Sequence, residues 1–184
     1  MTATTEWIED HFIAGNLALD FANTVYRRWP EPGPDLFSDT TDLATWLAHT
    51  GLLLDGESDV DEGTLHEARA LRALLWTVFD AHKDDRSIPA DAFTDLLDTT
   101  QRSITDMTVH ADGTATAQNA QGSLAIVALR AITLLLDPPP QGVRACDRCG
   151  WFFVDSSRSR RRRWCSMKTC GNQAKAARYR STHA

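Results

Sequence analysis

The sequence RACDRCGWFFVDSSRSRRRRWCSMKTCGNQ, which runs from Arg144 to Gln173, holds all four cysteines of the chain. Their spacing is C-x2-C, then fifteen residues, then C-x4-C. Two residues between paired cysteines allow a tight turn that places both sulfurs on one side, where one metal ion can reach them. Four thiolates complete a tetrahedral site for Zn²⁺. The spacing therefore predicts one structural zinc ion, with the ligands Cys146, Cys149, Cys165 and Cys170.

Two disulfides or four unpaired buried thiols are the alternatives to a metal site. The chain opens with MTATTEWIEDHF, which has no basic region and no apolar stretch, so we expect no secretory signal and a cytoplasmic location where thiols stay reduced. Isolated buried cysteines would not be expected to cluster within twenty-five residues. A catalytic zinc keeps an open position and usually has His or carboxylate ligands, whereas the only histidine of this segment is His183.

The residues around the cysteines predict a small fold. An apolar run with strand propensity, Trp151-Phe152-Phe153-Val154, lies between the two pairs. Good helix formers follow the last cysteine, from Gln173 to Arg180. The first cysteine pair, with the tight turn between its members, is a zinc knuckle. A knuckle, a strand, a basic turn, the second cysteine pair and a helix follow one another in this segment, and this order predicts a treble-clef-like zinc finger.

Basic residues surround the predicted metal site. Five arginines fall within six positions just before Cys165. Because zinc with four thiolates carries a formal charge of −2, nearby cations could simply neutralise it. Five arginines exceed that need, and a basic run beside an aromatic residue favours binding to a phosphate backbone. The candidate nucleic-acid contacts are Arg158, Arg160, Arg161, Arg162, Arg163, Lys168, Asn172, Lys175, Arg178 and Arg180.

This segment resembles the CGNR zinc-finger family. The family pattern of C-x2-C, an aromatic strand ending in Asp, Arg-Arg-Trp-Cys-Ser and Cys-Gly-Asn-Arg stands here as Cys146-Asp147-Arg148-Cys149, Trp151 to Asp155, Arg162-Arg163-Trp164-Cys165-Ser166 and Cys170-Gly171-Asn172-Gln173. Gln173 replaces the arginine of the motif, which removes a charge that could meet a phosphate or a nearby carboxylate. The metal ligands are unaffected by this departure.

The net charge of −6 hides an asymmetry between two parts of the chain. From Arg144 onward, eleven Lys and Arg residues face only Asp147 and Asp155. Residues 1–143 hold eight basic and 23 acidic residues. A basic module on an acidic domain is typical of nucleic-acid binding. The alternative is that the basic module docks on its own acidic domain.

Residues 15–28 predict a helix with Asn16 as its N-cap. Its segment Leu19-Asp20-Phe21-Ala22-Asn23-Thr24 resembles the start of the ABATE domain, which precedes the CGNR finger in a family of stress-induced transcription regulators. Asp20 and Asn23 are polar residues on a largely apolar helix. They are either a structural hydrogen-bonding pair that holds the following loop, or part of a ligand pocket. The candidate pocket residues are Asp20, Asn23, Trp29 and Trp46.

The remaining acidic part predicts a mainly α domain with one small β-hairpin, which is an α+β class. The hairpin is indicated by the turn signal Asp112-Gly113. We place Arg69 and Arg72 at the surface of the longest helix. We expect one helix, capped by Ser123, to lie at the centre of the core, because it is apolar nearly all round. The expected elements are a loop at 29–37, a helix ending near His49, helices at 62–83 and from Pro89, a hairpin within 104–118 and the central helix from Ser123 to Asp137.

The predicted organisation is an acidic helical domain at 1–137, a Pro-rich linker at 138–143 and a basic zinc finger at 144–184. We expect a DNA-binding transcription regulator whose helical domain senses a small-molecule effector or forms a homodimer. The alternative is a module that binds RNA or another protein. We expect no enzyme, because the chain lacks a recognisable catalytic constellation, and no membrane partner. We also expect metal removal to unfold the finger and to leave the helical domain intact.

Overall fold

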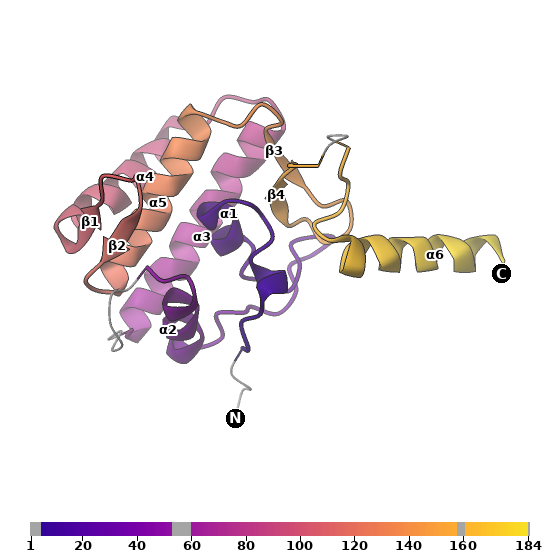
Figure 1. The fold of residues 1–184 in the computed structure, drawn as a ribbon, viewed down its shortest axis with the longest axis horizontal. Helices are drawn as coiled ribbons and strands as arrows, with labels where there is room; N and C mark the ends of the chain where they lie inside the picture. Colours follow the sequence, from indigo (N-terminus) through magenta and orange to yellow (C-terminus); the bar gives the residue numbers. More distant parts are fainter. Residues whose placement is uncertain (1–4, 53–59, 158–160, 184) are drawn as a thin grey trace.

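A computed structural model describes residues 5–52, 60–157 and 161–183. A body of packed helices carries the zinc-finger segment on one side, and the last helix extends away from both (Figure 1). The described part has two small antiparallel hairpins among its helices. The expected class, mainly α with a small finger, is confirmed.

Five helices form the body: α1 Leu17–Ala22, α2 Thr40–His49, α3 Glu62–Lys83, α4 Ala90–Arg102 and α5 Ala120–Leu136. Four of them begin at a side chain that accepts a hydrogen bond from a first-turn N–H, a group with no partner inside the helix. These caps are Asn16, Asp39, Asp61 and Asn119. Short 3-10 turns lie at Glu9–His11 and Ile104–Asp106.

Helix α5 lies at the centre of the body. It is apolar nearly all round and packs against α1, α3 and α4. A helix that is apolar on every side can lower its free energy only by being surrounded. The expectation of a central α5 is therefore confirmed, but its cap is Asn119 rather than Ser123. The Ser123 hydroxyl is buried and bonds the carbonyl of Asn119 instead.

The two hairpins are β1 Met107–Val109 with β2 Ala115–Ala117, and β3 Val143–Ala145 with β4 Phe152–Val154. The first matches the hairpin that the sequence predicts, with Gly113 at a φ of 80° in its turn. The second contains the predicted apolar strand and encloses the zinc knuckle. Its first strand begins at Val143, directly after the proline-rich connection from α5.

The predicted helix over 15–28 is too long. Helix α1 ends at Ala22, and the Thr24 hydroxyl bonds the carbonyl of Phe21. Val25 then pairs with Asp35 in an isolated β-bridge. Leu17, Phe21 and Val25 are spaced four residues apart, which suggests a longer helix. Val25 is indeed buried, but it belongs to extended chain.

Arg72 corrects the expectation of a surface role. Its guanidinium is buried and pairs with Asp35, with 2.7 Å between Arg72 Nη1 and Asp35 Oδ1. Arg72 also donates to the carbonyl of Thr24 at 2.8 Å. Buried cations are rare unless they are paired, and this pair holds the loop after α1 against α3.

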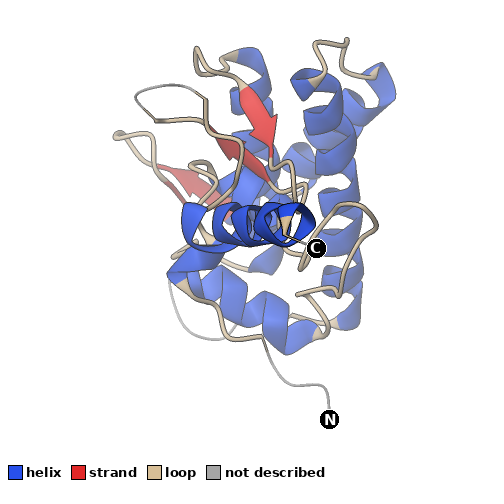
Figure 2. Ribbon diagram, turned by 90° about the vertical axis from the view of Figure 1, so that its right-hand side faces the viewer, coloured by secondary structure: helices blue, strands red, loops and turns tan. Residues whose placement is uncertain are grey.

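The finger and the helical body share one hydrophobic core. Phe152 of β4 packs edge-to-face on Phe79 of α3, with ring centroids 5.6 Å apart. Trp151 Nε1 donates to the carbonyl of Val25 at 2.8 Å. Seen end-on, α6 points toward the viewer while the β3–β4 hairpin lies against the helices behind it (Figure 2). The finger is thus held by packing as well as by the connecting chain.

Candidate metal centre and nucleic-acid interface

The four cysteines come together at the edge of the β3–β4 hairpin. Cys146 and Cys149 lie in the knuckle between the strands, where Gly150 donates to the carbonyl of Cys146 at 2.9 Å. Cys165 follows the arginine loop, which is the segment of residues 156–164. Cys170 lies in a wide π-helical turn, Met167–Gly171. Their ligand atoms all lie within 4.8 Å of one another, and all four side chains are buried.

This geometry fits tetrahedral zinc. The Sγ atoms of Cys149 and Cys165 are 3.5 Å apart, and those of Cys165 and Cys170 are 3.6 Å apart. Four sulfurs at Zn–S distances of about 2.3 Å would be roughly 3.8 Å apart, whereas a disulfide needs about 2.05 Å. The cysteines form no disulfides. The chain therefore has one structural zinc site, as its cysteine spacing predicts.

Two glycines allow the knuckle and the wide turn to pack closely. Gly150 has a φ of 75°, and a Cβ there would lie 3.0 Å from the Cβ of Arg28. A Cβ on Gly171 would lie 2.7 Å from Met167 Sδ and 3.1 Å from Trp164. The motif glycine that follows the last ligand therefore makes room for the π-helical turn.

Asp155, at the end of β4, organises the loop that leads to the second cysteine pair. Its buried carboxylate accepts hydrogen bonds from Ser157 Oγ at 2.6 Å, from the Arg162 N–H at 2.8 Å and from Arg144 Nη1 at 3.1 Å. Burial alone would raise the pKa of Asp155, but these bonds lower it to about 2. Asp155 is therefore ionised at neutral pH and fixes both ends of the arginine loop.

Arg162 has a structural role and is not a free phosphate contact. Its Nε donates to the carbonyl of Trp164 at 2.8 Å, and its Nη2 donates to the carbonyl of Cys165. The guanidinium lies 4.5 Å from the centre of the Phe153 ring. The sequence could not reveal this, because four consecutive arginines look alike until the fold selects one.

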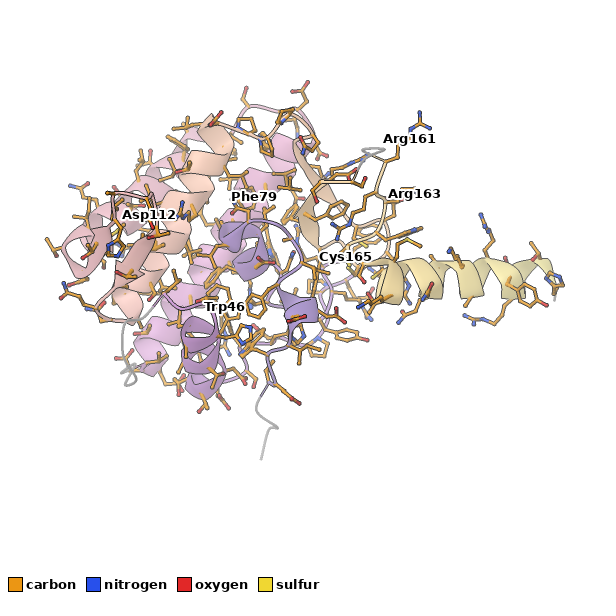
Figure 3. The ribbon with its side chains drawn as sticks, in the orientation of Figure 1. Trp46, Phe79, Asp112, Arg161, Arg163 and Cys165 are labelled. Atoms are coloured by element: carbon orange, nitrogen blue, oxygen red, sulfur yellow. The ribbon has the colours of Figure 1, made fainter. Side chains whose placement is uncertain are left out.

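The neighbouring arginines remain accessible. Arg161 is exposed, and Figure 3 shows its side chain and that of Arg163 extending outward, away from Cys165. Arg163 is two-thirds exposed, pairs with Asp147 at 2.7 Å and covers the Trp164 ring. The predicted contacts Arg158 and Arg160 lie outside the described residues.

Helix α6, Asn172–Thr182, extends from the zinc site and has no buried residue. Its side chains point into solvent all around the axis (Figure 3). The Asn172 amide donates to the carbonyl of Lys168 at 3.2 Å, which joins the wide turn to the helix. The predicted contacts that lie exposed on this turn and helix are Lys168, Asn172, Lys175, Arg178 and Arg180.

Comparison with protein-family models matches two segments. Residues 15–138 match the ABATE model, described as "Putative stress-induced transcription regulator", and residues 143–183 match the CGNR zinc finger. The first match covers most of the chain. The chain belongs to the ABATE family. A comparison with curated proteins gives no match.

The four candidate pocket residues of this ABATE protein do not surround one cavity. Trp46 is wholly buried in the core, whereas Trp29 is 60% exposed. The Asn23 amide bonds the backbone of Phe152. Asp20 accepts from the Ala14 N–H at 2.9 Å, and its burial raises its pKa to about 7. Both residues are therefore structural, but not as a pair that holds the loop after α1: Asp20 bonds the segment before the helix, and Asn23 bonds the finger.

Arg28 lies where the finger packs against the helical body, and the sequence does not predict this role. Its guanidinium lies 3.9 Å from the Phe152 ring centre, pairs with Asp80 at 2.7 Å and donates to the carbonyl of Gly150 at 3.1 Å. Burial lowers the pKa of Arg28, and Asp80 opposes that effect. No local pattern marks this role, because all three partners are distant in sequence.

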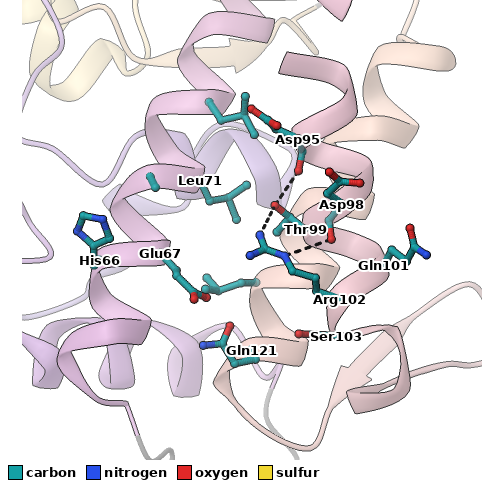
Figure 4. A pocket seen from close by; sticks show the side chains of 13 residues that line it. His66, Glu67, Leu71, Asp95, Asp98, Thr99, Gln101, Arg102, Ser103 and Gln121 are labelled. Carbon is teal, nitrogen blue, oxygen red and sulfur yellow. Dashed lines mark hydrogen bonds between the residues drawn. The ribbon is translucent and has the colours of Figure 1, made fainter. Parts of the chain in front are cut away.

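A hollow of about 970 Å³ lies between α3 and α4, on the helical body (Figure 4). Three carboxylates line it, those of Glu67, Asp95 and Asp98. Arg102 also lines it and donates to Thr99 Oγ1 and the Asp98 carbonyl of its own helix, both at 3.4 Å. This acidic wall is unsuited to a phosphate backbone, whereas all the predicted nucleic-acid contacts belong to the finger segment. None of the described helices is long and apolar enough to cross a membrane.

Proposed function

We propose that this ABATE protein is a transcription regulator that binds DNA through α6 and the arginine loop of its zinc finger. The observation that carries the proposal is the position of α6. Its first turn is joined to a zinc ligand, Cys170, and the rest extends beyond the body without burying a residue (Figure 1).

The dimensions of α6 suit the DNA major groove. Its eleven residues span about 16 Å at 1.5 Å per residue. A major groove of B-DNA, about 12 Å wide, admits one α-helix. An isolated helix this short gains little stability in water and is polar on every side, so contact with a partner would supply the stabilisation that burial does not.

The charges on α6 suit a polyanion. Lys175 and Arg178 are three residues apart and share a face, and Arg180 adds a third cation on the helix. Arg161 and Arg163 lie on the loop at the base of the helix, where they could contact flanking phosphates. Phosphate contacts of this kind set position and affinity, whereas sequence is recognised by contacts to base edges.

Single-stranded RNA is the second candidate ligand. Tyr179 is 65% exposed on α6 and stacks on His183, with ring centroids 4.1 Å apart. Exposed aromatic side chains beside cations are typical of proteins that stack unpaired bases. Preference for a single strand, lost in Tyr179→Ala, would favour this alternative over duplex DNA.

We infer a non-enzymatic role that is performed in the cytoplasm. All four cysteines belong to the metal site, so none serves as a nucleophile. A reducing compartment keeps the thiolates available to zinc, which supports the location. The helical body would supply regulation, in keeping with the family description.

A selection from a random duplex library tests the proposal. The zinc-loaded full chain should enrich a defined sequence, and Lys175→Ala/Arg178→Ala should lose that enrichment. The matched control is Arg86→Ala/Arg102→Ala, which removes two exposed cations from the helical body. Equal enrichment by both variants would refute the role of α6.

A further inference from the structure

A cavity of about 560 Å³ lies where the N-terminal segment, the loop after α1 and the zinc knuckle meet. Ile8 and Ile13 line it from the first segment, Tyr26 and Trp29 from the loop, and Trp151 from the finger. Its volume falls in the range of small-molecule sites, about 300–1,000 Å³. Three zinc ligands, Cys149, Cys165 and Cys170, also line it, so part of this volume belongs to the metal site, and the remainder can hold a small organic ligand.

The rim of this cavity gathers exposed apolar side chains. Tyr26 is 63% exposed, Trp29 is 60% exposed and Ile8 is 48% exposed. Single exposed apolar residues are ordinary, but several around one hollow mark an interaction site. Tyr and Trp offer flat faces, which favour stacking on an aromatic ligand.

One cation of the cavity is free to meet an acid group. Arg27 and Arg148 line the cavity, together with the carboxylate of Asp10 and three thiolates of the zinc site. Arg27 is already paired with Glu31 at 2.8 Å, whereas no carboxylate of the described residues pairs with the exposed Arg148. Burial is the main cause that lowers the pKa of His11, so this side chain adds no charge near neutral pH. Arg148 is thus the cation available to a ligand.

We propose that this cavity binds a small aromatic anion, with its ring against Tyr26 and Trp29 and its acid group at Arg148. The ligand would contact both the helical body and the finger, because its walls come from both. Thr169 and Gln173 also line the cavity, from the wide turn and the start of α6. An occupant would therefore lie at the base of α6. An effect on DNA binding rests on the proposed function, whereas ligand binding itself does not.

Fluorescence titration of the zinc-loaded full chain tests the proposal without nucleic acid. The probe is 1-anilinonaphthalene-8-sulfonate, an aromatic anion whose emission rises in apolar surroundings. We expect one site per chain. Trp29→Ala should weaken binding about tenfold through lost stacking. The matched control is Tyr179→Ala on α6, because Tyr179 and Trp29 are both aromatic and largely exposed. This control should leave the affinity unchanged.

The uncharged probe N-phenyl-1-naphthylamine separates the charge contribution. Arg148→Ala should weaken binding of the sulfonate about tenfold, the size of a hydrogen bond to a charged group. The same variant should leave binding of the uncharged probe unchanged. Circular dichroism of each variant verifies that the fold is retained.

Three outcomes would overturn the proposal. The first is the absence of saturable binding, and the second is equal sulfonate affinity in Trp29→Ala and the unaltered chain. The third is loss of binding in Lys175→Ala/Arg178→Ala with Arg148→Ala unaffected, which would place the probe on the basic surface of α6.

Discussion

The Asn23 side chain bonds both backbone polar groups of Phe152. Its Nδ2 donates to the Phe152 carbonyl at 2.9 Å, and its Oδ1 accepts from the Phe152 N–H at 2.8 Å. Asn23 closes α1 of the helical body, whereas Phe152 begins β4 of the finger. One buried amide thus joins the segments that match two different family models.

Asn23→Ala should destabilise the whole chain, because it leaves a buried N–H and a buried C=O without partners. Each such group costs about 1–3 kcal/mol, so we expect a loss of roughly 2–4 kcal/mol in the free energy of unfolding. Urea unfolding followed by tryptophan fluorescence measures it. The control Asn172→Ala, at an exposed site, should change little. A loss below 1 kcal/mol in Asn23→Ala would contradict the role of this pair.

Metal removal should weaken the helical body as well as the finger. The sequence alone suggested an independent finger, but Phe152 and Phe153 are fully buried in a core shared with α3. We expect chelation to abolish α6 and to lower the thermal midpoint of the remaining helices, as followed by circular dichroism. An unchanged midpoint for the helical body would show that the shared core contributes nothing to its stability.

Several elements could be predicted because their signals are local. The cap residues of α2 and the apolar stripe of α3 are encoded within the elements themselves, as is the turn of the first hairpin. Zinc ligation was also predictable, since spacing alone places the sulfurs together. The end of α1, by contrast, depends on the Val25 bridge to Asp35.

Residue roles that depend on distant partners could not be predicted. Arg72 is buried because Asp35 of a proline-rich loop reaches it. Arg162 is structural because two carbonyls and the Phe153 ring surround it. In the sequence it is one of four equivalent arginines. Exposure, which separates Arg161 and Arg163 from it, is a property of the folded chain.

The stability of the chain should fall as the pH rises through the range in which Asp20 titrates. The unfolded pKa is near 3.8, and burial raises the folded pKa to about 7. Between these values the folded state retains a proton that the unfolded state has lost, so stability decreases with rising pH and levels off above about 7. At about 1.4 kcal/mol per unit, the full effect is on the order of 4 kcal/mol at most.

Asp20→Asn isolates this effect, because the amide cannot ionise and its Oδ1 can still accept from Ala14. The variant should gain much more stability relative to the unaltered chain at pH 8 than at pH 4.5, as measured by urea unfolding. A difference that stays constant across this range would show that Asp20 does not titrate as described.

Asp155→Ala should loosen zinc, although Asp155 is not a ligand. Its carboxylate joins Arg144, Ser157 and the Arg162 backbone, so its loss frees the loop that carries Cys165. Residues that support metal ligands typically affect affinity 10–100-fold. We expect transfer of zinc to a colorimetric chelator to be about tenfold faster. Asp147→Ala, which removes one exposed ion pair with Arg163, is the control and should leave the rate nearly unchanged.

The salt dependence of DNA binding tests most directly whether α6 is the DNA-contacting helix. Fluorescence anisotropy with a labelled duplex gives the slope of log K against log salt concentration, which is about −0.9 per phosphate neutralised. For Lys175→Ala/Arg178→Ala we predict a slope shallower by about 1.8, with Arg86→Ala/Arg102→Ala unchanged. Identical slopes for the unaltered chain and the α6 variant would contradict the account.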